Sequence, residues 1–96
     1  AVPREFVLHQ NYPNPFNPVT HIRFDMPRGQ QVSLQIYNIL GQHVATLVDN
    51  EMLEAGFYEL AWNGANRHGL QVASGIYLYR IQAGRFVQTK KMLMLR

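Results

Sequence analysis

Histidine, serine and cysteine side chains often bind metal ions or act as bases and nucleophiles, and this 96-residue chain contains few of them. Its four histidines are far apart and never have the spacing that places two imidazoles on one face of a helix or strand. They are His9, His21, His43 and His68. Neither Ser33 nor Ser74 lies in a nucleophile-elbow motif, and cysteine is absent. The sequence therefore predicts no catalytic site, no metal and no cofactor, and we expect a protein that is not an enzyme.

Charged residues are distributed unevenly along the chain. All six acidic residues precede Leu60, and the rest of the chain carries only cations. These cations are Arg67, Arg80, Arg85, Lys90, Lys91 and Arg96. Such a distribution suits an anionic partner, although cations on the solvent side of strands also pair with acids on neighbouring strands. Nucleic acid is not predicted as a partner, because the cations are neither on a helix nor interleaved with an RNA-binding aromatic motif.

Apolar and polar residues alternate along most of the chain, with the period of a half-buried strand. The alternation is clear at Ile22, Phe24 and Met26, and again at 32–37, with a turn at 27–30 between the two segments. These two strands are either neighbours in one sheet or members of the two sheets of a sandwich.

Four further segments have strand character. The strands are predicted at 42–48, with a bulge where Val44 and Leu47 break the alternation, and at 57–62, 74–82 and 85–95. Residues 49–56 contain helix formers but too few for more than one turn, so a loop with a helical turn is expected there. Residues 63–69 predict a long turn, and Ala83-Gly84 predicts a tight hairpin. About seven short strands predict an all-β protein, an antiparallel β-sandwich of immunoglobulin-like type.

Aromatic side chains raise the alternative of carbohydrate binding, since planar sugar faces stack on exposed rings. Trp62 shares its parity with Tyr58 and Leu60, however, so we expect it in the core. Tyr37 is the aromatic residue expected at the surface.

Residues 10–18 read Gln-Asn-Tyr-Pro-Asn-Pro-Phe-Asn-Pro. Three prolines remove amide donors and keep the preceding residues out of the helical region, so the segment is stiff without being a helix or a central strand. It suits a strap along a sheet edge, with Tyr12 and Phe16 as anchors, or alternatively a stiff lead into the domain.

Together with residues 19–24, this segment resembles the opening of the type A C-terminal sorting domains of type IX secretion system cargo proteins. The resemblance continues in order along the chain, through a Val-x-Leu-x-Ile-Tyr block ending at Gly41, a Trp-Asn-Gly turn, a Ser-Gly-x-Tyr strand and a Lys-Lys-aliphatic end. The matching segments are 32–44, 62–64, 73–77 and 89–95.

The resemblance implies a sorting module that directs an attached N-terminal cargo protein through the periplasm and the outer-membrane translocon to the cell surface. It also implies that a surface sortase removes the domain, upstream of its folded part. The residues on which it places recognition by the translocon are Pro13, Asn14, Pro15, Gly41, Lys90 and Lys91.

A chain of this length makes one small domain. We expect residues 1–5 to be the tail of an upstream linker and residues 6–96 to be a single, monomeric sorting domain. The competing interpretation is an immunoglobulin-like spacer, or an adhesive or carbohydrate-binding accessory module of a larger surface protein, because a sandwich fold does not determine function.

Overall fold

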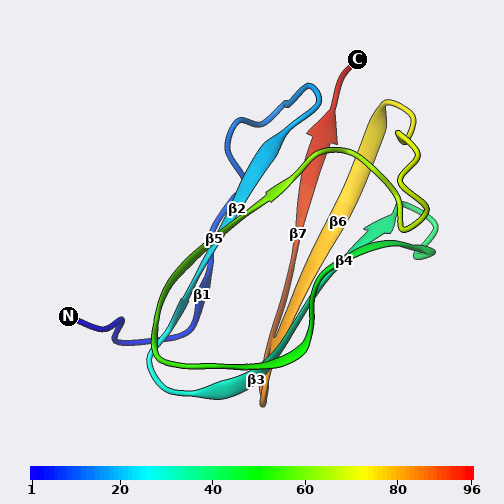
Figure 1. Ribbon diagram of the computed structural model, residues 1–96. Helices are drawn as coiled ribbons and strands as arrows, with labels where there is room; N and C mark the ends of the chain where they lie inside the picture. The colour runs from blue at the N-terminus through cyan, green and yellow to red at the C-terminus, as the bar shows by residue number, and fades with distance from the viewer.

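The computed structural model describes residues 1–96 and contains seven strands in two antiparallel sheets (Figure 1). The strands are β1 (Val7–Leu8), β2 (Thr20–Met26), β3 (Gln30–Asn38), β4 (His43–Leu53), β5 (Gly56–Trp62), β6 (Gly75–Ala83) and β7 (Phe86–Met94). The all-β sandwich that the alternation predicted is confirmed. The structure has no helix of the length and hydrophobicity needed to cross a membrane.

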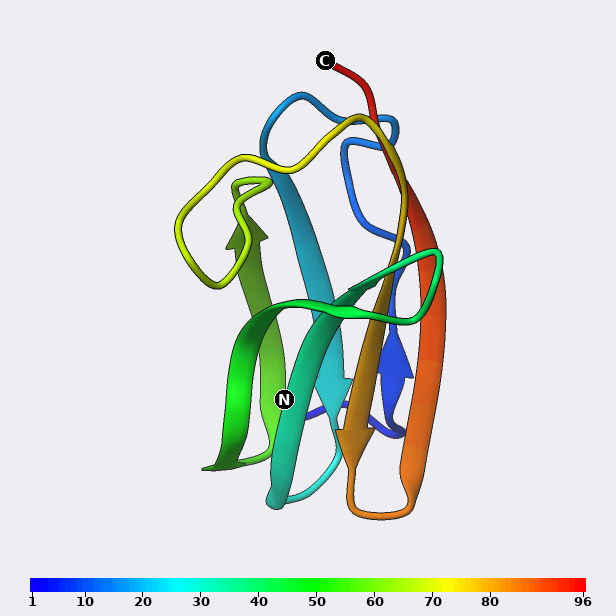
Figure 2. The same ribbon diagram turned by 90° about the vertical axis from the view of Figure 1, so that its right-hand side faces the viewer.

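The smaller sheet has the order β1-β2-β5, and the larger sheet has the order β4-β3-β6-β7. Residues 27–29 connect β2 to β3 and carry the chain from one sheet to the other, so the two strands are not neighbours in one sheet. Figure 2 shows that β1 and β7 lie along the same side of the sandwich. β7 is therefore an edge strand that adjoins the first part of the chain.

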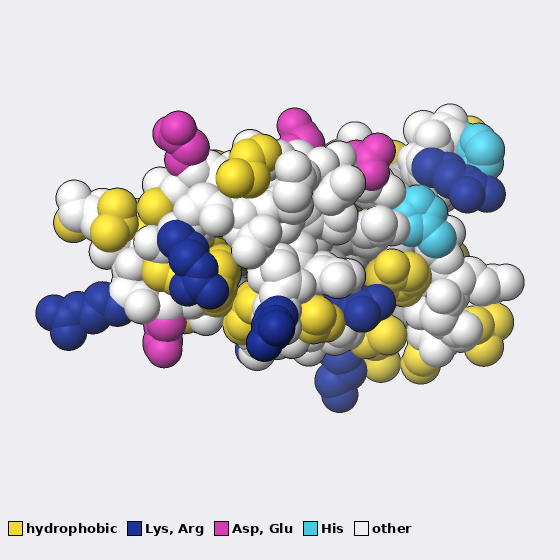
Figure 3. Space-filling model, turned by 90° about the horizontal axis from the view of Figure 1, so that it is seen from below, with side chains coloured by type: hydrophobic (Ala, Val, Ile, Leu, Met, Phe, Trp, Pro, Cys, Tyr) yellow, Lys and Arg dark blue, Asp and Glu magenta, His cyan; other side chains and the backbone are white.

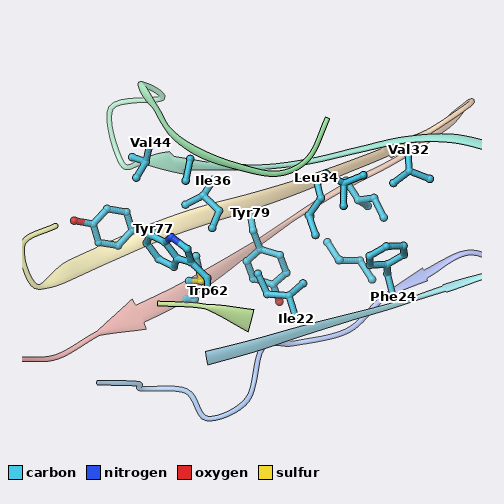
Figure 4. Packing of buried hydrophobic residues seen from close by; sticks show 14 of the residues in the cluster. Ile22, Phe24, Val32, Leu34, Ile36, Val44, Trp62, Tyr77 and Tyr79 are labelled. Atoms are coloured by element: carbon cyan, nitrogen blue, oxygen red, sulfur yellow. The ribbon is translucent and has the colours of Figure 1, made fainter. Parts of the chain in front are cut away.

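The core fills the space between the sheets and follows the period-two pattern of the sequence. Ile22 and Phe24 point inward from β2, and Val32 and Leu34 point inward from β3 (Figure 4). Met26 of β2 is fully buried as well. Eighteen buried apolar residues form one cluster, which includes Trp62 as expected. Tyr37 is partly exposed on the outer face of the larger sheet, also as expected.

One predicted segment is wrong. Residues 49–56 were expected to form a loop with a helical turn, but β4 continues to Leu53, and Glu51 and Leu53 pair with Val32 and Gln30 of β3. The backbone groups of β3 need partners over their whole length, and this requirement outweighs the weak helix preference of a short segment. The predicted bulge is confirmed, because the β3–β4 register shifts three times.

Candidate recognition surface

Residues 10–18, here called the strap, connect the two sheets at their shared edge (Figure 2). On one side the strap binds the end of β7 by four hydrogen bonds. The Phe16 N–H donates to the Leu93 carbonyl and the Leu95 N–H donates to the Phe16 carbonyl, both at 3.0 Å. The Leu93 N–H donates to the Asn14 side-chain oxygen at 2.9 Å, and the Gln10 side chain donates to the Lys91 carbonyl at 2.7 Å. The predicted strap along a sheet edge is therefore confirmed.

On its other side the strap binds β2 of the smaller sheet. Tyr12 and His21 exchange two backbone hydrogen bonds of 3.0 and 2.9 Å. The buried Asn11 side chain donates to the Thr20 hydroxyl at 2.9 Å, and this hydroxyl donates to the Pro13 carbonyl at 2.8 Å. The polar groups that the strap carries into the interior are thus satisfied, as buried polar groups must be.

Tyr79 of β6 fixes the start of the strap from within the core. Its hydroxyl accepts a hydrogen bond from the Asn11 N–H at 2.8 Å and donates one to the His9 carbonyl at 2.7 Å. Burial raises the pKa of Tyr79 to about 12, with a smaller opposing effect from the Asn11 hydrogen bond. Neither Asn11 nor Tyr79 was expected from the sequence to hold the strap, because the two residues lie 68 positions apart.

The two expected anchors of the strap behave differently. Phe16 is 2% exposed and packs against Trp62 with ring centroids 5.8 Å apart, whereas Tyr12 is 75% exposed. Tyr12 as an anchor is therefore a wrong prediction. Residues directly opposite each other in an antiparallel pair share one face, and the partner of Tyr12 is His21, which points outward. Asn11, the residue before Tyr12, takes the inward position instead.

The structure gathers three of the predicted recognition residues in one place. Asn14 of the strap lines a surface hollow of about 490 Å³ together with Lys90 and Lys91 of β7. Lys91 is exposed and Lys90 is half-buried, in keeping with the opposite orientations of adjacent residues in a strand. Pro13 and Pro15 flank Asn14 on the exposed side of the strap. Lys and Arg side chains lie among hydrophobic ones on the face seen in Figure 3.

Gly41 is not part of this group of residues. It lies in the β3–β4 turn with φ of 82°, where a side chain would meet nothing within 4 Å. Asn38 organises this turn, because its side-chain oxygen accepts hydrogen bonds from the N–H groups of Leu40 and Gln42. The role predicted for Gly41 in recognition stays a prediction.

The Trp-Asn-Gly turn supports the end of β7 in a way that the sequence did not indicate. A Cβ atom at Gly64 would lie 2.3 Å from the terminal methyl carbon of Met94 and 3.2 Å from the Pro18 carbonyl oxygen. Gly64 also has φ of 76°, in the left-handed region that favours glycine. The Arg96 side chain binds the same loop through the Gln71 side chain and the Val72 carbonyl.

Two of the four histidines form pairs with carboxylates on the outer face of the smaller sheet. His9 lies 3.0 Å from Asp25, and His21 lies 3.5 Å from Glu59. No group of three or more histidine, cysteine or acidic side chains is arranged to hold a metal ion.

Comparison with known proteins places these features in a family. The family model described as a secretion system C-terminal sorting domain matches residues 10–95. The match begins at Gln10, the first residue of the strap. It ends at Leu95, which follows β7 and donates a hydrogen bond to Phe16 of the strap. A comparison with curated proteins found no relative that matches the chain.

Two solved structures from Porphyromonas gingivalis share the fold. A dimeric latent PorU has 21% sequence identity and a TM-score of 0.69, and the match covers 94% of this chain and 9% of PorU. PorZ, described as an essential surface component of the type IX secretion system, has 21% identity and a TM-score of 0.62, covering 93% of this chain and 11% of PorZ. The chain thus corresponds to a small part of each of these proteins.

Proposed function

Since the chain belongs to the family of secretion system C-terminal sorting domains, we propose that it directs an attached cargo protein through the outer-membrane translocon of the type IX secretion system. A sorting domain acts on the protein that carries it, so the chain is exported toward the cell surface with its cargo. In this proposal the domain passes through the periplasm as a folded monomer and is a substrate of the machinery, not a catalyst.

The family match over residues 10–95 is the observation that carries the proposal. The arrangement of the strap and β7 supports it, because both segments that resemble the family's signals meet at the hollow lined by Asn14, Lys90 and Lys91. An exposed cationic surface beside a sheet edge is a suitable place for recognition by other proteins.

The proposal extends to removal of the domain by a surface sortase. Cleavage between cargo and domain requires an accessible backbone, and the first strand begins only at Val7. Residues 1–5 and any upstream linker are therefore where we expect cleavage. Mass spectrometry of cargo recovered from the surface should find a new C-terminus at or before this segment, whereas a C-terminus within β2–β7 would contradict the proposal.

A reporter fusion tests delivery. We expect a reporter joined to the N-terminus of residues 1–96 to reach the surface of a host with the translocon and to stay in the periplasm of a mutant host without it. Surface delivery that is the same in both hosts, or in neither, would overturn the proposed function.

The lysines test the recognition surface. Replacing both Lys90 and Lys91 by alanine should change the free energy of unfolding by less than about 1 kcal/mol, because charges at the protein surface contribute little. Delivery of the fused reporter should nevertheless fall, and arginine at both positions should restore much of it. Normal delivery by the folded alanine variant would show that these lysines take no part in recognition and only keep the strand face in contact with water.

A second candidate function, carbohydrate binding by an accessory module, is favoured by one observation. Tyr12 and Phe57 expose 75% and 66% of their surface on the outer face of the smaller sheet, beside Arg23 and Glu59. Exposed rings next to charged and polar groups suit a sugar. Affinity electrophoresis in gels containing surface polysaccharide should show retardation that Tyr12→Ala abolishes, and free migration would exclude this candidate.

A further inference from the structure

The outer edge of β7 is only partly used by the fold. In an antiparallel pair, the backbone groups of alternate residues point toward the partner strand and away from it. The strap shows which residues of β7 point away from β6, because it binds Lys91, Leu93 and the following Leu95. Val87 and Thr89 continue this alternation, so their N–H and C=O groups also point outward.

These groups form a stretch of unpaired edge at residues 87–91, here called the open edge. No hydrogen bond on the outer side is made by the N–H or C=O of Val87 and Thr89, or by the N–H of Lys91. The stacking of Phe6 on Phe86 lies before the open edge, and the bond from Gln10 to Lys91 lies after it. Unpaired edge groups are a template for another strand.

The space beside the open edge is hollow and cationic. Thr89, Lys90 and Lys91 line the hollow of about 490 Å³, and Arg80 of β6 is the direct cross-strand partner of Thr89. Neither β6 nor β7 contains an acidic residue. The side chains of an added strand would lie beside those of β7 on the same face, so carboxylates are favoured next to Lys91 on one face and Lys90 on the other.

We propose that the open edge binds an extended acidic segment of a partner protein, which joins the larger sheet as a further strand. Backbone hydrogen bonds to Val87, Thr89 and Lys91 supply affinity, and carboxylates near the lysines supply selectivity. The inference rests on the proposed function for the place of this partner in the secretion machinery. Binding itself is a property of the domain.

A second copy of the chain fits the open edge less well. Pairing two copies through β7 would place the cations of both copies around one joint, without a carboxylate from either strand to offset them. Lysine on an edge strand is a common means of preventing such self-pairing. The charge of the edge therefore favours an acidic segment over a second copy.

Synthetic peptides provide the first test. The probe is a valine-rich peptide with an adjacent pair of glutamates, so that one carboxylate lies on each face of the added strand, and its control has lysine in place of both glutamates. Hydrogen exchange followed by NMR should show that the glutamate peptide slows exchange of the Val87, Thr89 and Lys91 amides, and that the lysine peptide binds about tenfold more weakly or worse. No protection at these amides, equal binding of both peptides, or self-association through β7 would overturn the proposal.

Proline at the open edge provides the second test. Thr89→Pro removes an outward N–H without removing a bond to β6, and should weaken binding of the glutamate peptide about tenfold or more. Ala61→Pro is the matched control. Ala61 of β5 lies opposite His21 of β2. Because the backbone groups of His21 point toward the strap, those of Ala61 point away from β2, at the free edge of β5. Equal weakening by both variants, at matched denaturation midpoints, would overturn the proposal.

Charge reversal keeps the proposal testable if the proline variant does not fold. Lys90→Glu combined with Lys91→Glu should reverse the preference, so that the lysine peptide binds more tightly than the glutamate peptide. An unchanged preference would refute the role of these lysines in selectivity. The reporter assay separates the two proposals: failure of the unmodified domain to deliver cargo refutes the proposed function, whereas normal delivery by folded Thr89→Pro refutes only the role of the open edge in delivery.

Discussion

The two halves of β7 have the same partner strand on one side and different surroundings on the other. From the Lys91 carbonyl to the end of the strand, the strap binds the outward backbone groups. From Val87 to Thr89, nothing binds them. The strapped half, from Lys91 onward, thus contributes hydrogen bonds that join the two sheets, whereas the outward backbone groups of the open edge contribute none. A substitution in the strap and a substitution on the open edge should therefore have different kinds of effect.

The largest expected effect is that of Phe16→Ala, which removes the anchor of the strapped half. Deleting a buried aromatic ring should lower the free energy of unfolding by about 3–5 kcal/mol. Tyr12→Ala is the control on the same segment and should change it by less than about 0.5 kcal/mol, because its ring is exposed. Denaturant unfolding of both variants checks the difference, and similar midpoints would mean that the ring of Phe16 does not anchor the strap.

Tyr79→Phe should also lower the free energy of unfolding, by about 1–3 kcal/mol, since it leaves the Asn11 N–H and the His9 carbonyl without their partner. The pH dependence gives an independent measure. The pKa of Tyr79 is raised from 10.0 to about 12 in the folded protein, so this stabilisation is complete below pH 10 and is lost as the pH rises toward 12. The phenylalanine variant should lack this part of the alkaline decline, and an identical decline in both proteins would contradict the assignment.

Two glycine substitutions compare the Trp-Asn-Gly turn, which supports the end of β7, with the β3–β4 turn, which is separated from β7 by β6 in the larger sheet. Gly64→Ala should cost about 2–3 kcal/mol, because the new methyl group meets Met94 and the backbone is in the left-handed region. Gly41→Ala should cost only the conformational part, about 1 kcal/mol, because its surroundings are open. Thermal or denaturant unfolding measures both, and equal costs would show that packing at Met94 plays no part.

Among substitutions that remove a contact with β7, Asn14→Ala should have the smallest effect, because it removes one hydrogen bond between the strap and the Leu93 N–H. The loss should be about 0.5–1 kcal/mol, since water can replace the acceptor at this exposed position. Exchange of the Leu93 amide should accelerate, while the Phe16 amide, which binds the Leu93 carbonyl, stays protected. Asn14→Asp keeps an acceptor and serves as the control. An unchanged rate at Leu93 would show that this bond does not form in solution.

Much of the fold could be predicted because its cause is local. Alternation at Ile22, Phe24 and Met26 placed these residues in the core, and the parity of Trp62 placed its ring there too. The continuation of β4 through Glu51 and Leu53 could not be predicted, because it depends on pairing with β3 and not on the preferences of the segment itself.

The sequence by itself determined the alternation of the strands, the stiffness of the strap, the scarcity of catalytic residues and the family resemblance. Only the tertiary structure decided that Asn14 meets Leu93, 79 positions away, and that Tyr12 faces solvent while Asn11 is buried. The physical reason is that periodicity fixes which residues share a face, whereas the two sheets, packed together, fix which strand edges lie side by side. The sequence could not show which backbone groups of β7 remain unpaired, because this depends on where the strap lies along β7.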